Sequence, residues 1–377
     1  MFRNLLLFLL LLPVLVPASA IDLAPFSYKD PRSLSLGGIT VFGVPGIHTL
    51  HANPANFSQD DDVLYTLVSA VPHISLPPDL FFSLKDLSEN EILEAGSSGL
   101  GQGMNIGMGL TGKGVGLGLL WGYESYSFGD ASTIQGVVDS ELSLVLGYAM
   151  EFRLGDFIFT GGGDFRPVFR VFGPYGSETA LETGKLLGRP GKMMEVLAGL
   201  ENPCYATGVG FDLGATAGWK GLGLGVTIRD AGDTIMAVSR PSDVGEAMDD
   251  MFSLSGFSLE EGASDTLTVP MRIDAGLMFS FEDYFFPGLR PDLYLEMGDL
   301  LHIGEGTGLL ESLRGGINLD TSGPLSIRTG FNAGGFSSGL GLELPILDID
   351  LSYYRLPAVD AAEEGRHGFA LEGRVEF

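Results

Sequence analysis

Residues 366–377 read Arg-His-Gly-Phe-Ala-Leu-Glu-Gly-Arg-Val-Glu-Phe. Apolar side chains in this stretch alternate with small or charged ones: Phe369, Leu371, Val375 and Phe377 against Ala370, Glu372, Arg374 and Glu376. A period of two sends successive side chains to opposite faces of a β-strand. Such a strand lies either between a core and water in a soluble sheet or between lipid and lumen in a membrane barrel. Slipping the register by one residue would move the charges to the apolar face, so the register is well specified.

The start of the chain predicts secretion. Arg3 precedes an apolar run from Leu5 to Val16, and the sequence Ala18-Ser19-Ala20 follows it. A basic head, an apolar middle and an Ala-x-Ala ending are the parts of a secretory signal peptide, so we expect residues 1–20 to be cleaved off after export through the inner membrane. No cysteine stands at the cut site, and we therefore expect no lipid anchor.

The hydrophobicity of the remaining chain is dispersed in short pieces. Hydrophobic residues make up 45% of the sequence and the mean hydropathy is +0.25. After residue 20, however, no run approaches the roughly 20 apolar residues that a membrane-spanning helix needs. The final strand also ends on an aromatic residue, and Phe369, Leu371, Val375 and Phe377 resemble the terminal signal that the barrel-assembly machinery of bacteria recognises. These features favour a β-barrel in the outer membrane.

Composition limits the function. The formal net charge is -27 and the chain has 56 glycines. Such a charge argues against binding of nucleic acid, whose phosphates demand Lys and Arg, but it suits a barrel whose charges face water. The single cysteine, Cys204, permits no internal disulfide and has no reactive context, so we interpret it as filler.

Alternating stretches predict about fourteen strands, an even number as in bacterial single-chain barrels. The predicted strands are 63–70, 103–110, 113–123, 139–153, 156–166, 205–219, 221–229, 269–281, 291–299, 311–320, 324–332, 336–344, 346–355 and 366–377. We therefore predict an all-β, transmembrane antiparallel barrel over residues 63–377. Glycines at 103, 107, 109, 114, 116 and 118 would either widen its lumen or allow close packing against a plug, and the sequence leaves both open.

Connection lengths support the barrel. With both chain ends in the periplasm, odd-numbered connections are extracellular and long, whereas even-numbered ones are short turns. The long ones are 71–102, 124–138, 167–204, 230–268, 300–310 and 356–365. Two connections break the pattern, because 282–290 is long for a turn and 333–335 is short for a loop. A β-sandwich gives no reason for this alternation.

Residues 21–62 differ from the rest of the chain. They contain scattered prolines, the glycine-rich stretch 36–38 and the sequence Asn53-Pro54-Ala55, but no sustained alternation. A run of small residues followed by Asn-Pro-Ala just before the first strand resembles the hatch of the FadL-like outer-membrane transporters, a superfamily that includes long-chain fatty acid transporters, PorV-type barrels and FadL-like proteins of spirochaetes. This resemblance implies a plug in the lumen over residues 21–62, which would move to admit a substrate, and exit of the substrate sideways into outer-membrane lipid.

The resemblance also implies that substrate docks at external loops. Two long predicted loops carry basic and methionine-rich patches: Lys185, Arg189, Lys192, Met193 and Met194 in one, and Met248, Met251 and Phe252 in the other. Methionine adapts to irregular apolar ligands. Burial of each CH₂ contributes about 0.8 kcal/mol, whereas an exposed ion pair contributes about 0 to 1 kcal/mol, so the cations would orient a fatty acid more than bind it. The alternative is that the two patches pack on each other.

Charged residues on the predicted lumen faces form a second candidate site. They are Arg272, Asp274, Arg314, Asp320 and Arg328. They could hold a polar head group, or they could form a structural ladder of ion pairs between neighbouring strands, which is the interpretation we favour.

No enzyme motif is evident. His48 and His51 have a spacing seen in metal sites, but no cysteine lies near them and they fall in the predicted plug, so we expect no metal site. No Gly-x-Ser-x-Gly elbow occurs, and the glycine-rich runs lack the context of a nucleotide fingerprint. We therefore expect a non-enzyme without a cofactor.

The sequence thus predicts an outer-membrane channel for hydrophobic molecules, with long-chain fatty acids as the leading substrate. A PorV-like barrel that serves protein secretion or surface assembly, and a general porin, remain as alternatives. Protein partners in a pull-down would indicate the former, and swelling of liposomes in small sugars would indicate the latter.

Overall fold

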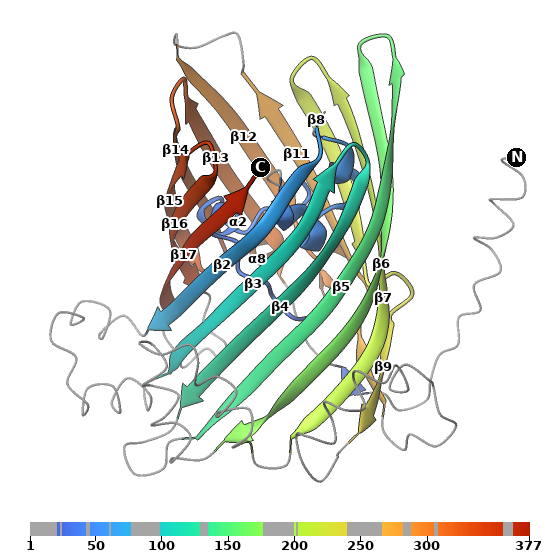
Figure 1. Ribbon diagram of the computed structural model, residues 1–377, viewed down its shortest axis with the longest axis vertical. Coiled ribbons are helices and arrows are strands. Elements are labelled where there is room, and N and C mark those ends of the chain that lie inside the picture. The colour runs from blue at the N-terminus through green and yellow to red at the C-terminus, as the bar shows by residue number, and fades with distance from the viewer. Residues whose placement is uncertain are drawn as a thin grey trace, which may run out of the picture.

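The computed structural model describes residues 21–22, 25–42, 46–59, 62–76, 99–128, 135–175, 200, 203–239, 266–281, 288–304, 308–356 and 365–377. They form a closed antiparallel β-barrel of 14 strands around a short N-terminal segment (Figure 1). The ring closes where the last strand, β17 (Arg366–Glu376), pairs with β2 (Leu64–Leu76). The predicted all-β barrel of about 14 strands is confirmed.

Most of the remaining strands pair with the strand before and the strand after them in the chain. In order they are β3 (Leu100–Gly112), β4 (Val115–Phe128), β5 (Gln135–Leu154), β6 (Phe157–Tyr175), β7 (Cys204–Trp219), β8 (Leu222–Arg229), β9 (Thr234–Ser239), β10 (Thr266–Val269), β11 (Arg272–Ser280), β12 (Leu289–Met297), β13 (Leu313–Thr321), β14 (Leu325–Asn332), β15 (Gly335–Glu343) and β16 (Leu347–Leu356). Two positions in the ring are filled by interrupted strands, β8 with β9 and β10 with β11. A two-residue strand, β1 (Ile21–Asp22), pairs in parallel with β10.

Several strands are longer than the sequence predicts. β2 continues to residue 76, β6 continues to residue 175, and β9 and β10 extend into the predicted loop 230–268. Pro72 and Pro167 lie within the extended parts of β2 and β6, although proline cannot donate to a sheet ladder. Pro72 nevertheless pairs with Met104 inside the β2–β3 ladder and is exposed on the outer side, between the buried Val71 and His73.

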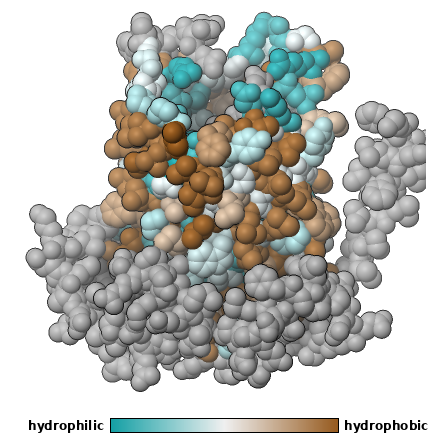
Figure 2. Space-filling model, viewed as in Figure 1, coloured by the Kyte–Doolittle hydropathy of each residue, from teal (hydrophilic) through white to brown (hydrophobic). Residues whose placement is uncertain are grey.

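Large apolar side chains cover the outside of the barrel. Figure 2 shows hydrophobic residues across the middle of the wall and hydrophilic ones at the rim where the short turns lie. We call this rim the turn end and the opposite rim the loop end. Aromatic rings gather toward the turn end, where Phe157 stacks on Trp219 and Phe377 stacks on Tyr65. An apolar band with an aromatic girdle is typical of outer-membrane barrels.

The final strand has the faces that its sequence predicts. Leu371 is exposed on the outside, whereas Glu372 and Arg374 on the other face are buried in the interior. We expect Leu371→Arg to destabilise the folded barrel by about 2–4 kcal/mol, because it places a cation near the middle of the lipid-facing band. Urea unfolding in lipid vesicles measures this change. Val375→Arg, close to the turn end, is the matched control and should cost about 0–1 kcal/mol; equal costs at the two positions would contradict the assignment of the band.

The N-terminal segment, residues 25–42 and 46–59, lies within the ring of strands (Figure 1). We call it the inner segment. Its elements are α2 (Pro31–Ser35), η1 (Ile47–His51) and η2 (Pro54–Ser58). Asp30 caps α2 by accepting hydrogen bonds from the backbone N–H groups of Arg32 and Ser33, which is the arrangement that stabilises a helix start. Two short helical elements, η7 (Leu300–His302) and α8 (Leu309–Ser312), lie between β12 and β13.

In the part of the chain that the structure describes, no helix is both long and apolar enough to cross a membrane. The predicted signal peptide, residues 1–20, lies outside the described residues.

Candidate functional site

Asn53, Pro54 and Ala55 anchor the inner segment. The Asn53 side chain accepts a hydrogen bond from the Ala55 backbone N–H at 3.0 Å, and Pro54 occupies the first position of η2, where its missing N–H costs nothing. The Asn53 amide also donates to the carbonyl oxygen of Val41 at 3.0 Å and to that of Val226 in β8 at 3.5 Å. This fully buried side chain therefore joins two parts of the inner segment to the barrel wall.

Glycines in the wall make room for the inner segment. A Cβ atom on Gly116 would lie 2.5 Å from the Phe57 ring, and one on Gly162 would lie 2.5 Å from the Pro54 carbonyl oxygen. Similar close approaches occur around the ring, at Gly107, Gly109, Gly118, Gly147, Gly214, Gly225, Gly276, Gly316, Gly330 and Gly339. Of the glycines that the sequence singles out, Gly107, Gly109, Gly116 and Gly118 pack against the inner segment, whereas Gly103 approaches Tyr123 and His73 of the wall.

An apolar cluster holds one side of the inner segment. Ile47, Leu50 and Phe57 pack against Leu120 and other residues of β4 and β5. Tyr28 adds a hydrogen bond between its hydroxyl and the Ser143 hydroxyl at 2.8 Å. Burial raises the pKa of Tyr28 well above its ordinary value, so the hydroxyl remains protonated.

Buried ion pairs hold the other side. The guanidinium group of Arg32 donates to Asp350 in β16 at 2.7 Å. Asp350 also accepts from Arg328 in β14, and Arg374 in β17 donates to Asp348 at 2.6 Å. All of these arginines are at most 4% exposed. A buried charge that loses its partner is strongly destabilising, so this network fixes the inner segment to the wall at β14, β16 and β17.

The lumen residues that the sequence singles out lie in such networks. Arg314 lies opposite Glu296 in the β12–β13 register and pairs with it at 3.1 Å, while also donating to the Gly38 carbonyl oxygen. Arg272 pairs with Asp274 at 3.1 Å on the same strand. Arg328 belongs to the network of Arg32, and Asp320 lies near the turn end, opposite Ser326 of β14. Arg314 and Glu296 therefore form one rung of the ladder that we favour, whereas Arg328 reaches two strands away.

A second polar site lies at the break between β8 and β9. Its residues at 230–233 fall in the predicted loop 230–268. Asp230, Gly232 and Asp233 have positive φ values of 48°, 82° and 64°, so the chain leaves the ladder and returns to it. Arg166 of β6 reaches Asp230 at 2.9 Å and Asp212 at 3.4 Å. The sequence Asp-Ala-Gly-Asp at 230–233 is a turn signal that could have indicated this break.

Cations with free N–H groups lie beside an apolar lining at this break. Arg229 Nε and Nη2, Arg166 Nε and Arg272 Nε are buried without a hydrogen-bond partner among the described residues. Toward the loop end, an apolar cluster lines the interior beside this break: Val168, Ala206, Met236, Leu267 and Val269, with Phe172 and Val238 packed against it. The arrangement places hydrogen-bond donors next to apolar surface.

A groove of about 580 Å³ lies on the outer face of β5 to β8. Met150, Phe152 and Phe159 border it together with Leu224, and Gly161 lies among its lining residues. Gly162, the next residue along β6, contacts Pro54 on the inner face. The wall between the groove and the Asn-Pro-Ala sequence is therefore only one backbone thick.

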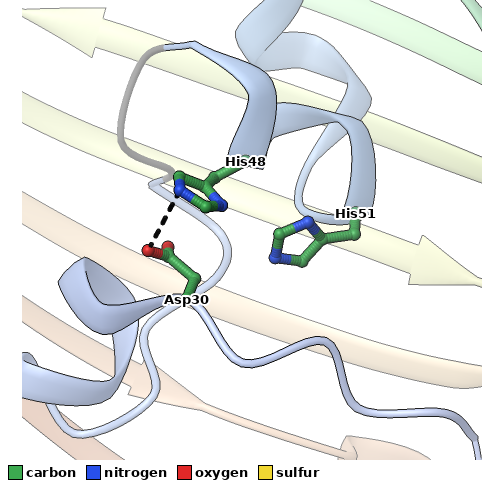
Figure 3. A group of neighbouring side chains, drawn as sticks. All are labelled: Asp30, His48 and His51. Carbon is green, nitrogen blue, oxygen red and sulfur yellow. Dashed lines mark ion pairs between the residues drawn. The ribbon is translucent and has the colours of Figure 1, made fainter. Parts of the chain in front are cut away.

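A third cluster joins the two halves of the inner segment. Asp30, before α2, lies near His48 and His51 of η1 (Figure 3). His48 Nε2 is 2.8 Å from Glu372 of β17 and 3.6 Å from Asp30. Although burial opposes it, these carboxylates raise the pKa of His48 above its ordinary value, and His48 in turn lowers the pKa of Asp30. Burial, with the charge of His48, lowers the pKa of His51 to about 3.

The predicted docking residues in the long loops lie outside the described residues. These are Lys185, Arg189, Lys192, Met193, Met194, Met248, Met251 and Phe252. Their role as a docking site stays a prediction.

The chain is thus an outer-membrane-type β-barrel with a segment folded in its lumen. No protein-family model matches the sequence, and a search of curated proteins gives no match. Among solved structures, the Pseudomonas putida toluene transporter TodX is 13% identical with a TM-score of 0.46, over 95% of this chain and 99% of that one. The Ralstonia pickettii toluene transporter TbuX is 11% identical with a TM-score of 0.47, over 93% and 98%.

A more distant similarity is to the translocator domain of the autotransporter NalP from Neisseria meningitidis, at 12% identity and a TM-score of 0.38, over 87% of this chain and 94% of that one. At these identities the likeness concerns the fold alone.

Proposed function

We propose that this protein is an outer-membrane channel for hydrophobic molecules, in which the inner segment acts as a hatch. The observation that carries this proposal is a separate stretch of chain packed into the lumen of a closed barrel. The stretch is held by side-chain contacts and hydrogen bonds, and among the described residues no strand of the ring other than β10, through β1, pairs with it or with the residues before it. Such a plug can move without opening the ring.

The interior near the break between β8 and β9 supports long-chain fatty acids as the substrate class. A carboxylate would satisfy N–H groups of Arg229 and Arg272, whose burial without a partner costs about 1–3 kcal/mol per group. The apolar cluster around Met236 would face the tail, and each buried CH₂ contributes about 0.8 kcal/mol. The head would therefore set the orientation and the tail would supply most of the affinity.

The same break supports a sideways exit. The β7–β8 ladder ends at Leu213 and Ile228, and the β7–β9 ladder resumes only at Gly208 and Met236. Between these points the backbone N–H of Ala231 still donates to the Phe211 carbonyl oxygen at 2.7 Å. A wall held there by fewer ladder hydrogen bonds is the place where a hydrophobic molecule would leave for outer-membrane lipid.

A permanently closed barrel that binds a secretion or assembly partner is the second candidate. The observation that favours it is the extent of the buried ion pairs between the inner segment and the wall, above all Arg32 with Asp350. Moving the inner segment would break these pairs. A barrel whose inner segment never moves could keep many such pairs, because none of them would have to break.

Uptake by cells tests the proposal directly. A deletion strain that carries the gene on a plasmid is expected to take up radiolabelled oleate or toluene faster than the strain with an empty plasmid. Purified protein in liposomes should give no swelling in small sugars, because the inner segment fills the lumen. Equal uptake with and without the gene would refute the channel, and rapid swelling would indicate a general porin instead.

A further inference from the structure

Asp30, His48 and His51 are brought together only by folding of the inner segment. Each contributes one potential metal-ligand atom, and these atoms all lie within 4.8 Å of one another. Figure 3 shows both imidazole rings facing the region beside the Asp30 carboxylate. A fourth group arrives from the barrel wall, because Glu372 of β17 lies 2.8 Å from His48 Nε2.

His51 has an atom without a role in the fold. Its Nδ1 is buried and has no hydrogen-bond partner among the described residues, although the residue as a whole is partly exposed. Its ring instead contacts the rings of Tyr28 and His48, at centroid distances of 5.5 and 5.6 Å. A cavity of about 20 Å³, room for one small atom or ion, borders both histidines; Lys29 also lines it, whereas Asp30 and Glu372 are not among its lining residues.

The charges around the cluster favour a cation. Among the described residues, the surrounding ion-pair network has more carboxylates than guanidinium groups: Asp30, Glu343, Asp348, Asp350, Glu372 and Glu376 against Arg32, Arg328 and Arg374. When both imidazoles are neutral, this network retains a surplus of negative charge. A divalent cation between Asp30 and Glu372 would offset the surplus.

The donor set selects the kind of ion. Two imidazole nitrogens with two carboxylate oxygens suit zinc, which takes four ligands at about 2.0–2.2 Å. Calcium and magnesium prefer six or more oxygen ligands, which this cluster does not offer. Tetrahedral ligands at such bond lengths lie about 3.3–3.6 Å apart, and the separation of His48 Nε2 from Asp30 Oδ1 is 3.6 Å. Glu372 would shift outward slightly and His51 would rotate inward.

We propose that Asp30, His48 and His51, with Glu372 of β17, form a binding site for a zinc ion. The ion would replace the hydrogen bond between His48 and Glu372. It would join the start of α2 to η1 and both of them to the wall, so that binding stabilises the position of the inner segment inside the barrel. Zinc binding at this position does not depend on whether the barrel transports anything.

Zinc titration of the purified full-length barrel tests the site. Protein in mild detergent, stripped with EDTA and dialysed, is expected to bind about one zinc ion per chain in calorimetry and elemental analysis. His51→Ala and Asp30→Asn should each weaken binding at least about 10-fold. Asp30→Asn retains a side chain that can cap α2. His302→Ala removes a histidine outside the cluster and should leave the affinity unchanged.

Cobalt substitution gives a readout that needs no variant. Co²⁺ in a four-coordinate site of nitrogen and oxygen ligands gives intense visible absorption, which zinc should quench by displacement. Heat-modifiable migration in gels verifies that each variant is a folded barrel. The proposal is overturned if the stripped protein binds no zinc, if folded His51→Ala binds it as tightly as the unmodified chain, or if the cobalt spectrum is that of a six-coordinate ion.

Discussion

Hydrophobic uptake should stop when the inner segment is tied to the wall by a disulfide. A Cβ atom on Gly276 of β11 would lie 3.2 Å from the Cβ atom of Val41, slightly shorter than the usual 3.5–4.5 Å of a disulfide. We expect Val41→Cys with Gly276→Cys, in a Cys204→Ser background, to reduce uptake to the level of the deletion strain when oxidised. Because the tether is covalent and reversible, dithiothreitol should restore uptake in the same cells.

The matched control ties the wall to itself. A Cβ atom on Gly218 of β7 would lie 3.9 Å from the Cβ atom of Ile158 of β6, its partner in the β6–β7 ladder, and it would approach no residue of the inner segment within 4 Å. Gly218→Cys with Ile158→Cys should therefore transport equally well in the oxidised and reduced forms. Undiminished uptake by the oxidised Val41–Gly276 pair would mean that this part of the inner segment stays in place during transport, and the hatch would have to be abandoned.

Removal of the Phe57 ring should cause the largest loss of stability. Phe57 is fully buried, and it contacts the wall at Gly116 and Gly147. We expect Phe57→Ala to cost about 3–5 kcal/mol because it leaves a cavity between the inner segment and the wall. Gly147→Ala should also destabilise, since a Cβ atom there would overlap the ring. Urea unfolding in micelles measures the loss of stability, and limited proteolysis reports whether the inner segment has left its position in the lumen.

The double variant Gly147→Ala with Phe57→Ala distinguishes a direct contact between the two residues from a general loss of stability. If the Gly147 methyl group acts by displacing the Phe57 ring, Gly147→Ala should cost much less in a Phe57→Ala background than alone, because contacting residues are not additive. Gly161→Ala is the control, because its Cβ atom would meet nothing within 4 Å, and its effect should stay within about 0.5 kcal/mol. If the stability losses of Gly147→Ala and Phe57→Ala simply add in the double variant, the two residues do not contact each other as the structure indicates.

The ring of strands was predictable because its determinants are local. Each strand shows its lipid-facing and lumen-facing residues as an alternation within the strand itself. β17 illustrates this, since Phe369, Leu371 and Val375 lie on the outer face as their spacing indicates. Strand ends were less predictable, and Pro72 shows why. A proline predicts a strand end only where its missing N–H would break the ladder, and the sequence does not show which hydrogen bonds the ladder uses.

The candidate sites were less predictable than the fold. Asn53, Pro54 and Ala55 carry a local capping arrangement that can be recognised from residue types. The sequence shows how many glycines the strands contain, but it does not show which residue of the inner segment each of these glycines contacts. His48 and His51 have a spacing seen in metal sites, but the sequence does not show which groups lie beside them in the fold, because Asp30 and Glu372 are distant from them in the sequence.

The amino-acid sequence by itself determined that this chain forms an antiparallel barrel of about 14 strands, and it determined which face of each strand meets lipid, since alternation with a period of two is a property of neighbouring residues. Only the tertiary structure decided what fills the lumen and what holds it there. Arg32 meets Asp350 across 318 positions of sequence, and this happens because closure of β17 against β2 returns the end of the chain to its beginning.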